Sequence, residues 1–522
     1  MQIRRLTCHS FTSSLSSVLL TFILSTIIMP NTPAADQRES EMAPPNFILL
    51  MGDDHGWEET GYNGHPDVKT PVLDKMAESG LRLDRFYSAH PSCSPTRGSV
   101  LTGRHPNRYG TFYPGYSLRP QERTIGHLLK EAGYLCGHFG KWHVGTVKKE
   151  SPTNPGAMGF DEWVSHDNFF ELNPPLSRNG GPPEIHQGES SAVVIDESLR
   201  FIKQAKDRKK PFLAVVWFGS PHEPYSGLPE DLALYDNLPK KYADRAPVSL
   251  TSNETGRKVK RPLGEVLRER YAEITAMDRA IGKLRDFLRR EGLRDNTLVW
   301  YCGDNGTPPS GVLASPLRGH KGHVYEGGTR VPAVIEFPAR IAKPRISEVN
   351  TVTSDMLPTL CTLAGTPVPK DRPLDGIDLV PLLEDRLRER PSPIFFWCFN
   401  DSLRMKAKPK PWIDPKMQEG TTPLVKIMGG RKTRNFRNYH HPDINETDYR
   451  GPRAMLGNQY KLVVHDNKGG DQKVELFDLR ADPAEKNDLT GTKPEIAKKM
   501  QAELRTWQDS VLRSLTGKDY EK

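Results

Sequence analysis

The N-terminal part of the chain alternates short apolar runs with longer amphipathic stretches. The apolar runs have the length of strands and lie at 46–51, 134–139, 211–218, 297–302 and 331–337. Four helices are predicted between them. The first spans 70–80, the second ends near Gly133, the third lies around 191–206, and the fourth is a long helix that ends at Gly292. The long helix carries apolar residues at 3-4-3-4 spacing: Ile274, Met277, Ile281, Leu284 and Leu288. This alternation predicts an α/β fold with a large, mostly parallel central sheet flanked by helices.

The C-terminal part has a different pattern. Two strand-like runs at 458–465 and 473–479 flank a glycine-containing turn, which predicts a small antiparallel sheet. A terminal helix follows, with Ile496, Met500, Leu504, Trp507 and Val511 on one face. We therefore expect a main domain at 36–390 and a smaller C-terminal α+β subdomain at 391–522. Residues 400–455 have no periodicity and are interpreted as a long insertion or loop.

The first 35 residues have the pattern of a secretory signal peptide. Arg4 and Arg5 precede an apolar run at 18–29, and small residues follow at 33–35. A membrane anchor is the alternative, but about 20 apolar residues are needed to span a bilayer. The sequence therefore predicts a secreted or periplasmic protein with no stable membrane insertion after cleavage.

Composition changes this picture little. The chain is 36% hydrophobic and 26% charged, which is ordinary for a globular protein. Its net charge is +8, and loss of the two arginines in residues 1–35 lowers it to +6. Mild basicity suits an anionic substrate, although a solvated surface explains it equally well. No nucleic-acid partner is expected.

Cysteine usage singles out one residue. Of six cysteines, Cys8 would leave with the signal peptide, so an odd number would remain. At least one of these is then unpaired or is no longer a thiol. Four lie in apolar runs, where buried inert cysteines are common: Cys136, Cys302, Cys361 and Cys398. Cys93 instead lies in a polar segment beside Pro95 and Arg97.

Polar residues follow four of the predicted strands. They are Asp53 and Asp54 after the first, Lys141 and His143 after the second, His222 after the third, and Asp304 and Asn305 after the fourth. Ligands of open α/β sheets bind beyond the carboxyl ends of the strands. Each group alone could be an ordinary polar turn or helix cap, but together they predict one shared site.

The residue types at this predicted site suggest its chemistry. Asp53, Asp54, Asp304 and Asn305 supply hard oxygen ligands, which suit Ca²⁺ or Mg²⁺ better than Zn²⁺. The cations Arg97, Lys141 and Lys321 could hold a tetrahedral oxyanion, although each alone would ordinarily be a surface charge. The histidines His143 and His222 could transfer protons.

Cys93 and Arg97 would lie one turn apart if a helix begins near Pro95, and a helix N-terminus attracts anions. Cys93 could then act as a thiolate nucleophile. A thiolate is poorly matched to a hard divalent metal, so an oxygen nucleophile would fit this site better.

The segment CSPTRGSVLTGR at 93–104 resembles the signature of the type I, formylglycine-dependent sulfatases, which are arylsulfatase-like members of the alkaline phosphatase superfamily. The resemblance extends through NFILLMGDDHG, GKWHVG, PHEP, GDNG and KGHVYEGGTRVP (321–332), in the family's order. ELFDLRADPAEKNDL at 475–489 resembles the hallmark of its C-terminal subdomain. One departure is Thr96, where the family usually has serine.

This resemblance implies a function for each candidate residue. In the family the cysteine, here Cys93, is converted during export to Cα-formylglycine (3-oxoalanine) by a formylglycine-generating enzyme or a sulfatase maturase, and the hydrate attacks sulfur. Asp53, Asp54, Asp304 and Asn305 resemble the family's calcium ligands, and the modified Cys93 would complete the calcium shell. Arg97 resembles the arginine that holds the formylglycine. Lys141, His222 and Lys321 resemble substrate-binding residues, with His222 or Lys321 protonating the alcohol, and His143 resembles the base for the second step.

The resemblance therefore implies a sulfuric ester hydrolase that uses Ca²⁺ rather than Mg²⁺. A sulfated saccharide is our hypothesis for the substrate, from export and mild basicity. One alternative is a phosphodiester or phosphonate monoester hydrolase of the same superfamily. The other is a non-catalytic exported protein that binds sulfated glycans.

Overall fold

The computed structural model describes residues 43–252, 257–311, 315–406, 408–423, 432–467 and 471–521. The predicted signal peptide at 1–35 lies outside these residues. Within the described residues, no helix has both the length and the apolar character needed to cross a bilayer.

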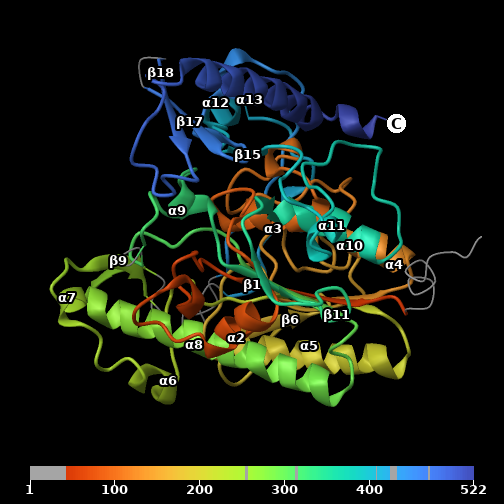
Figure 1. Ribbon diagram of the computed structural model, residues 1–522. Helices are drawn as coiled ribbons and strands as arrows, with labels where there is room; N and C mark the ends of the chain where they lie inside the picture. Colours follow the sequence, from red (N-terminus) through yellow and green to blue (C-terminus); the bar gives the residue numbers. More distant parts are fainter. Residues whose placement is uncertain are drawn as a thin grey trace, which may run out of the picture. The chain divides into compact units, whose positions relative to one another are not determined.

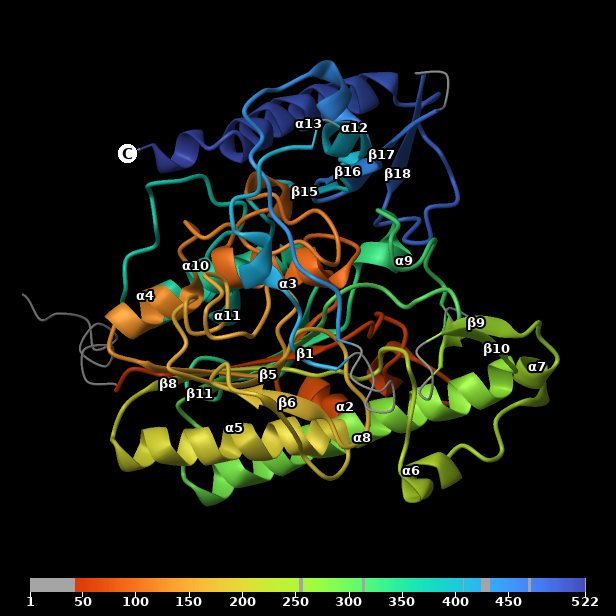
Figure 2. The same cartoon turned by 180° about the vertical axis from the view of Figure 1, so that it is seen from behind.

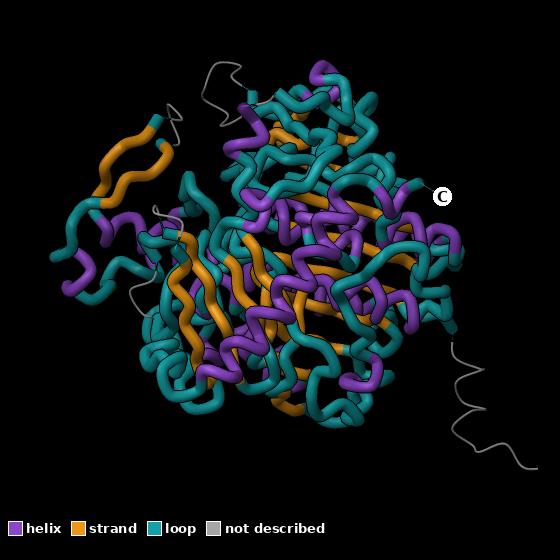
Figure 3. Tube along the Cα trace, turned by 90° about the horizontal axis from the view of Figure 1, so that it is seen from above, coloured by secondary structure: helices purple, strands orange, loops and turns teal. Residues whose placement is uncertain are grey.

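A ten-stranded mixed sheet forms the centre of residues 44–522, with strand order β13-β2-β12-β11-β1-β8-β4-β5-β6-β7. Its middle four strands are β11 (Thr297–Gly303), β1 (Asn46–Gly52), β8 (Phe212–Trp217) and β4 (Leu135–Lys141). These neighbours are all parallel, as the continuous apolar runs predict. Figure 3 shows the strands in orange, with helices lying across them.

The outer strands add antiparallel pairs. The predicted strand at 331–337 is β12 (Ala333–Glu336), which runs antiparallel to β11. The other strands of this sheet are β2 (Leu81–Leu83), β13 (Arg345–Ser347), β5 (Glu162–His166), β6 (Pro175–Arg178) and β7 (Pro183–Ile185). Two small sheets pair β3 (Phe86–Tyr87) with β14 (Thr351–Val352), and β9 (Val248–Thr251) with β10 (Lys258–Arg261).

Helices cover both faces of the central sheet (Figures 1 and 2). One face packs against α2 (Pro71–Ser79), α5 (Ser190–Asp207) and α8 (Leu263–Arg290), and the other against α3 (Cys93–Thr102), α4 (Ile125–Glu131) and α10 (Met356–Leu363). Strand β1 contributes Phe47, Leu49 and Met51 to one core and Ile48 and Leu50 to the other.

The predicted helices are confirmed, with small changes at their ends. All five apolar positions singled out in the long helix α8 are buried. Thr70 lies at the N-cap of α2, but its hydroxyl donates to Asp74 instead of capping the helix. The segment after Cys93 is helical from Cys93 itself, two residues before Pro95.

The C-terminal part contains the predicted antiparallel sheet and terminal helix. Its four strands are β15 (Ile394–Trp397), β16 (Arg453–Leu456), β17 (Tyr460–Asp466) and β18 (Gln472–Asp478), packed against α13 (Pro494–Leu515). In the described part of 400–455, regular structure is limited to β16 and short segments: α12 (Ser402–Lys406), η5 (Pro415–Gln418) and η6 (Glu446–Tyr449). The domain boundary near 390 stays a prediction.

The remaining helical segments are short. They are η1 (Gly61–Asn63), η2 (Pro106–Arg108), α6 (Pro229–Ala233), α7 (Lys240–Ala243), α9 (Glu326–Thr329), η4 (Thr353–Asp355), α11 (Val380–Leu383) and η7 (Lys518–Tyr520).

Candidate active site

The four strand ends that carry the predicted polar residues lie side by side. Strands β11, β1, β8 and β4 are consecutive in the sheet and parallel, so their carboxyl ends share one edge. The backbone N–H of Asp54 donates to Asp304 Oδ1 at 2.9 Å, which joins the ends of β1 and β11. Lys141 Nζ donates to Asp53 Oδ2 at 2.5 Å, which joins the ends of β4 and β1.

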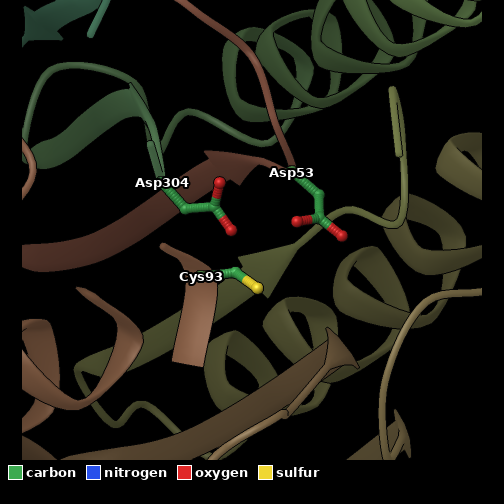
Figure 4. A group of neighbouring side chains, drawn as sticks. All are labelled: Asp53, Cys93 and Asp304. Atoms are coloured by element: carbon green, nitrogen blue, oxygen red, sulfur yellow. The ribbon is translucent and has the colours of Figure 1, made fainter. Parts of the chain in front are cut away.

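A buried oxygen-rich cluster lies at this edge. The ligand atoms of Asp53, Cys93 and Asp304 all lie within 4.8 Å of one another, and Figure 4 shows the three side chains together. Asp53 Oδ1 and Asn305 Oδ1 are buried and have no hydrogen-bond partner among the described residues. A buried polar atom without a partner costs free energy, so these oxygens are suited to a cation. The donor set fits a hard divalent ion.

Cys93 is the first residue of α3, and Arg97 follows one turn later. The thiol is buried, and this burial raises its pKa despite the nearby Lys141 and Lys321 ammonium groups. The folded protein therefore favours the thiol over the thiolate at position 93. Thr96 donates its hydroxyl to the carbonyl of His90 at 2.7 Å, a hydrogen bond that serine could also make.

Arg97 connects the cysteine helix to the acidic cluster. Its guanidinium donates to Asp304 Oδ2 at 2.7 Å and lies 3.4 Å from Asp53 Oδ1. It also donates to the carbonyl of Lys141 at 3.2 Å. Arg97 is fully buried, so this ion-paired arginine is part of the site rather than a surface charge.

The two lysines hold the other carboxylates. Lys321 Nζ lies 2.5 Å from Asp54 Oδ1, as Lys141 does from Asp53. Burial alone would raise the pKa of Asp53, but Lys141, His222 and Arg97 outweigh it and hold this pKa below its usual range. Burial and the charge of Asp53 raise the pKa of Asp304 to about 7. A cation bound beside Asp304 would favour the ionised form of this buried carboxyl group.

His222 presents one ring nitrogen to the cluster. Its ring stacks on Phe169 with centroids 5.0 Å apart, and Nδ1 contacts the carbonyl of Glu223. Because a carbonyl only accepts hydrogen bonds, Nδ1 carries the proton in this contact. Nε2 lies 3.7 Å from Asp54 Oδ2.

His143 is buried, and neither ring nitrogen has a hydrogen-bond partner among the described residues. Burial and the Lys141 charge hold its pKa well below the usual range, so the ring is neutral at pH 7. His143 and Asp54 have φ values of 58° and 63°, in the left-handed region. Such backbone costs about 1–3 kcal/mol per residue and occurs often at functional sites.

A cavity of about 400 Å³ opens beside this cluster. Its walls include three site residues, Asp54, His222 and Lys321. Other lining residues come from the β9–β10 hairpin and the loop after β11: Val248, Ser249, Leu250, Lys258, Pro308, Pro309 and Ser310. The cavity has the size of a small-ligand site.

Sequence reasoning missed Arg270, a buried residue of α8. Its guanidinium pairs with Glu59 at 2.6 Å and donates to the carbonyls of Asp54, at 2.7 Å, and Pro221, at 2.6 Å. Arg270 thereby fixes the backbone beside Asp54 and His222. A signal was present, because a charged residue at a helical position between Leu267 and Ile274 interrupts an apolar face.

Sequence reasoning also missed Asp167, which follows β5. One of its carboxylate oxygens accepts from the backbone N–H groups of Thr421, at 2.6 Å, and Thr422, at 2.9 Å, and from the hydroxyl of Thr433. The predicted insertion at 400–455 is fastened there to the central sheet. It brings Phe436 to His143, with ring centroids 6.2 Å apart.

Comparisons with known proteins agree with this arrangement. The family profile described as Sulfatase matches residues 45–366. The chain is 32% identical over 392 residues to N-acetylgalactosamine-6-sulfatase of Canis lupus familiaris, with 68% of each protein covered. It is 32% identical over 357 residues to an ulvan-active sulfatase of Formosa agariphila, with 67% of each covered.

Among solved structures, the fold is similar to that of Ps i-CgsB in complex with k-i-k-neocarrahexaose. The TM-score is 0.70 at 24% identity, covering 90% of this chain and 93% of that one. This similarity supports the architecture of the central sheet and the C-terminal sheet.

Proposed function

Because this chain belongs to the sulfatase family and is a hydrolase of sulfuric esters, we propose that it releases sulfate from a sulfated saccharide, using Cys93 after its conversion to formylglycine. The observation that carries this proposal is the placement of Cys93 at a helix N-terminus, within 4.8 Å of the ligand atoms of Asp53 and Asp304. The saccharide is supported by what the N-acetylgalactosamine-6-sulfatase and ulvan-active relatives are named for, and by the cavity beside His222 and Lys321.

Asp53, Asp54, Asp304 and Asn305, with the modified residue 93, would hold the metal. The buried, unpartnered Asp53 Oδ1 and Asn305 Oδ1 support this assignment. Ca²⁺ accepts an irregular shell of protein oxygens, whereas Mg²⁺ demands near-octahedral geometry and keeps several waters, so we assign Ca²⁺. When bound, the cation supplies positive charge that polarises the sulfuryl oxygens.

Conversion of Cys93 is supported by its surroundings. The raised pKa of the thiol makes it a poor thiolate, and hard oxygen ligands surround it. An aldehyde at this position supplies, as its hydrate, an oxygen nucleophile. Arg97, fixed by Asp304, orients residue 93 from one turn further along α3. The proposal includes export, a signal peptide at 1–35, and a maturation enzyme as a partner.

Lys141 and Lys321 bind the sulfate group in this proposal. Their ammonium groups contact Asp53 and Asp54 at 2.5 Å and can turn toward sulfuryl oxygens that arrive from the cavity. Fixed cations at a buried site stabilise charge that develops in the transition state more strongly than cations in water. Lys321 and His222 also line the cavity, where the saccharide would lie.

The histidines handle protons. The contact between Nδ1 of His222 and the Glu223 carbonyl leaves Nε2 facing the cluster. His222 can protonate the leaving alcohol from Nε2 only as the imidazolium, which then returns to the neutral form with its proton on Nδ1, whereas the Lys321 ammonium already carries a proton that it can give instead. Neutral His143 has unpartnered ring nitrogens, so it can accept a proton when sulfate is released.

The test combines mass spectrometry with turnover. We would measure the mass of the tryptic peptide containing Cys93, from protein made in its natural host, and sulfate release from a panel of sulfated saccharides. We expect the mass of an aldehyde at residue 93, sulfate release from at least one saccharide, and no release by Cys93→Ala. An unmodified thiol at residue 93 in active protein would overturn the assignment of formylglycine as the nucleophile. Faster turnover of phosphonate or phosphodiester substrates would favour the alternative activity.

A further inference from the structure

A second buried ionic cluster joins the C-terminal sheet to the loop that carries Lys321. Lys461, in β17, one of the two inner strands of the sheet, has no exposed surface. Its Nζ lies 2.9 Å from Glu326 Oε1 and 3.1 Å from Glu485 Oε1. Glu326 is the first residue of α9 and comes five residues after Lys321. The contact therefore spans from the C-terminal sheet to the edge of the active site.

Glu326 is held from several directions. Its other carboxylate oxygen accepts from the hydroxyl of Tyr87 at 3.0 Å, and its backbone N–H donates to Glu485 Oε2 at 2.7 Å. Both oxygens and the N–H group of this buried residue are thus engaged, so rotation of the side chain or of the start of α9 would leave polar atoms unpaired.

The other end of the loop is clamped to the same part of the chain. Arg318 donates to the carbonyl of Glu485 at 3.1 Å and to the carboxylate of Glu475, in β18, at 3.2 Å. Its guanidinium lies over the ring of Tyr325, 4.0 Å from the centroid, and the Tyr325 hydroxyl donates to Glu475. The loop from 318 to 326 is therefore anchored at both ends by the C-terminal part.

Inside the loop there is little room for movement. The backbone N–H of Lys321 donates to the carbonyl of Thr307 at 2.9 Å, and that of Gly306, beside Asn305, donates to the carbonyl of Gly328 at 3.0 Å. A Cβ added at Gly328 would lie 1.9 Å from the carbonyl oxygen of His323, so only glycine permits this packing. The backbone N–H of Gly327, in α9, donates to the carbonyl of Arg318 at 2.7 Å, so a shift of α9 would disturb both ends of the loop that carries Lys321.

We propose that Lys461, with Glu326 and Glu485, is a positioning cluster through which the C-terminal sheet sets the placement of Lys321 in the active site. It acts through the loop and touches no reacting group. The inference rests on the proposed role of Lys321 in binding sulfate. It gives the C-terminal sheet a part in catalysis beyond stabilising the fold.

A double-mutant cycle distinguishes positioning from stability. The variants are Lys461→Met, which keeps the apolar stem, Lys321→Ala, and the two combined, assayed well below their melting temperatures. We expect Lys461→Met to lower kcat/KM about tenfold or more when Lys321 is present, mainly by raising KM, and less than about twofold when it is absent. Equal losses in both backgrounds, or no loss in folded Lys461→Met, would overturn the inference.

A matched control separates this role from the loss of any buried ion pair. Arg453 is a buried residue in the same sheet, and its guanidinium lies 2.8 Å from Asp466 rather than on the Lys321 loop. Arg453→Met should lower stability, yet change kcat/KM by less than about twofold relative to the parent protein, whether Lys321 is present or replaced by alanine. Losses in Arg453→Met that match those of Lys461→Met would overturn positioning in favour of a general effect on the fold.

Two other results also bear on the inference: a Lys461→Met variant that does not fold, and a Lys321→Ala variant that stays fully active. If Lys461→Met does not fold, Glu326→Gln takes its place in the cycle, because it removes the charge that pairs with Lys461 while its amide oxygen can still accept from the Tyr87 hydroxyl, and the same criterion applies. If Lys321→Ala keeps full activity, the role of Lys321 under the proposed function is wrong, and the positioning inference fails with it. Additive losses with an impaired Lys321→Ala would overturn the positioning inference alone.

Discussion

The active-site cluster and the Lys461 cluster both bury opposite charges, but they differ in how fully those charges are partnered. At the active site, Asp53 Oδ1 and Asn305 Oδ1 have no hydrogen-bond partner among the described residues. Around Lys461, both oxygens of Glu326 and its backbone N–H are engaged. Glu485 Oε1 has no hydrogen-bond partner among the described residues, but it lies 3.1 Å from Lys461 Nζ. The active site therefore keeps two strand-end oxygens suited to a ligand, whereas the charges around Lys461 face one another and are suited to hold chain segments in place.

Left-handed backbone occurs in both clusters. Asp54 and His143 have left-handed φ values at the active site, and Glu485 has a φ of 53° in the Lys461 cluster. Lys461 itself lies in a regular antiparallel strand. Strained backbone is kept where surrounding contacts enforce it, and for Asp54 these include the hydrogen bond from Arg270 to its carbonyl oxygen at 2.7 Å.

Asp53→Asn should have the largest effect on activity. It removes charge from the active-site cluster and the partner of Lys141. We expect kcat/KM to fall by about a thousandfold or more, with reduced calcium content, because a metal supplies several kcal/mol of transition-state stabilisation. Steady-state kinetics and elemental analysis measure both. Asp231→Asn, at a buried acid paired with Arg279 outside the site, is the control and should keep its calcium. Normal calcium in Asp53→Asn would contradict the assignment.

Lys461→Met should have the largest effect on stability. It leaves the Glu326 and Glu485 carboxylates buried without their lysine. Breaking a buried pair in this way costs about 3 kcal/mol, measured as the free energy of unfolding in urea. Combining it with Glu326→Gln should recover part of that loss. Lys499→Met, at an exposed pair with Glu503 on α13, should cause no measurable change. If Lys461→Met unfolded at the same urea concentration as wild type, the ion pairs of Lys461 would not stabilise the fold.

The Lys461 cluster should also make stability depend on pH. Burial and the charge of Glu326, against Lys461, raise the pKa of Glu485 from 4.5 to about 7. The folded state then binds this proton more tightly than the unfolded state, so the stability it contributes is complete below pH 4.5 and is lost as pH rises to about 7. Glu485→Gln lacks this titration. The melting temperature of Glu485→Gln, relative to that of wild type, should therefore rise as the pH increases from 4.5 to 7. A constant difference across this range would refute the shift.

The smallest effects are expected at Thr96. Its hydroxyl donates to the His90 carbonyl at 2.7 Å. Thr96→Ser keeps this donor, so we expect no more than about a twofold change in formylglycine content or activity. Thr96→Val leaves a buried carbonyl short of a donor and should cost about 1–3 kcal/mol of stability. Thermal unfolding and peptide mass measurements report the two effects. Loss of maturation in Thr96→Ser would show that the natural threonine is itself required.

Much of the central sheet and the clustering of the candidate residues could be predicted. The apolar runs before Asp53, Lys141, His222 and Asp304 predicted buried strands, and parallel neighbours place their carboxyl ends at one edge. The antiparallel pairing of β12 could not be predicted, because its run, 331–337, is as apolar as those of the parallel strands. The roles of the site residues stay predictions.

By itself, the sequence determined which residue types stand at the strand ends and that Cys93 lies outside the apolar runs, because these follow from local order along the chain. Only the tertiary structure decided what fixes them. Arg270 reaches Asp54, and Lys461 reaches Glu326, 135 positions away in sequence. Such pairs depend on how distant segments pack. A lone charge in an apolar helix or strand reveals that a buried partner exists, but its identity emerges only when the chain is folded.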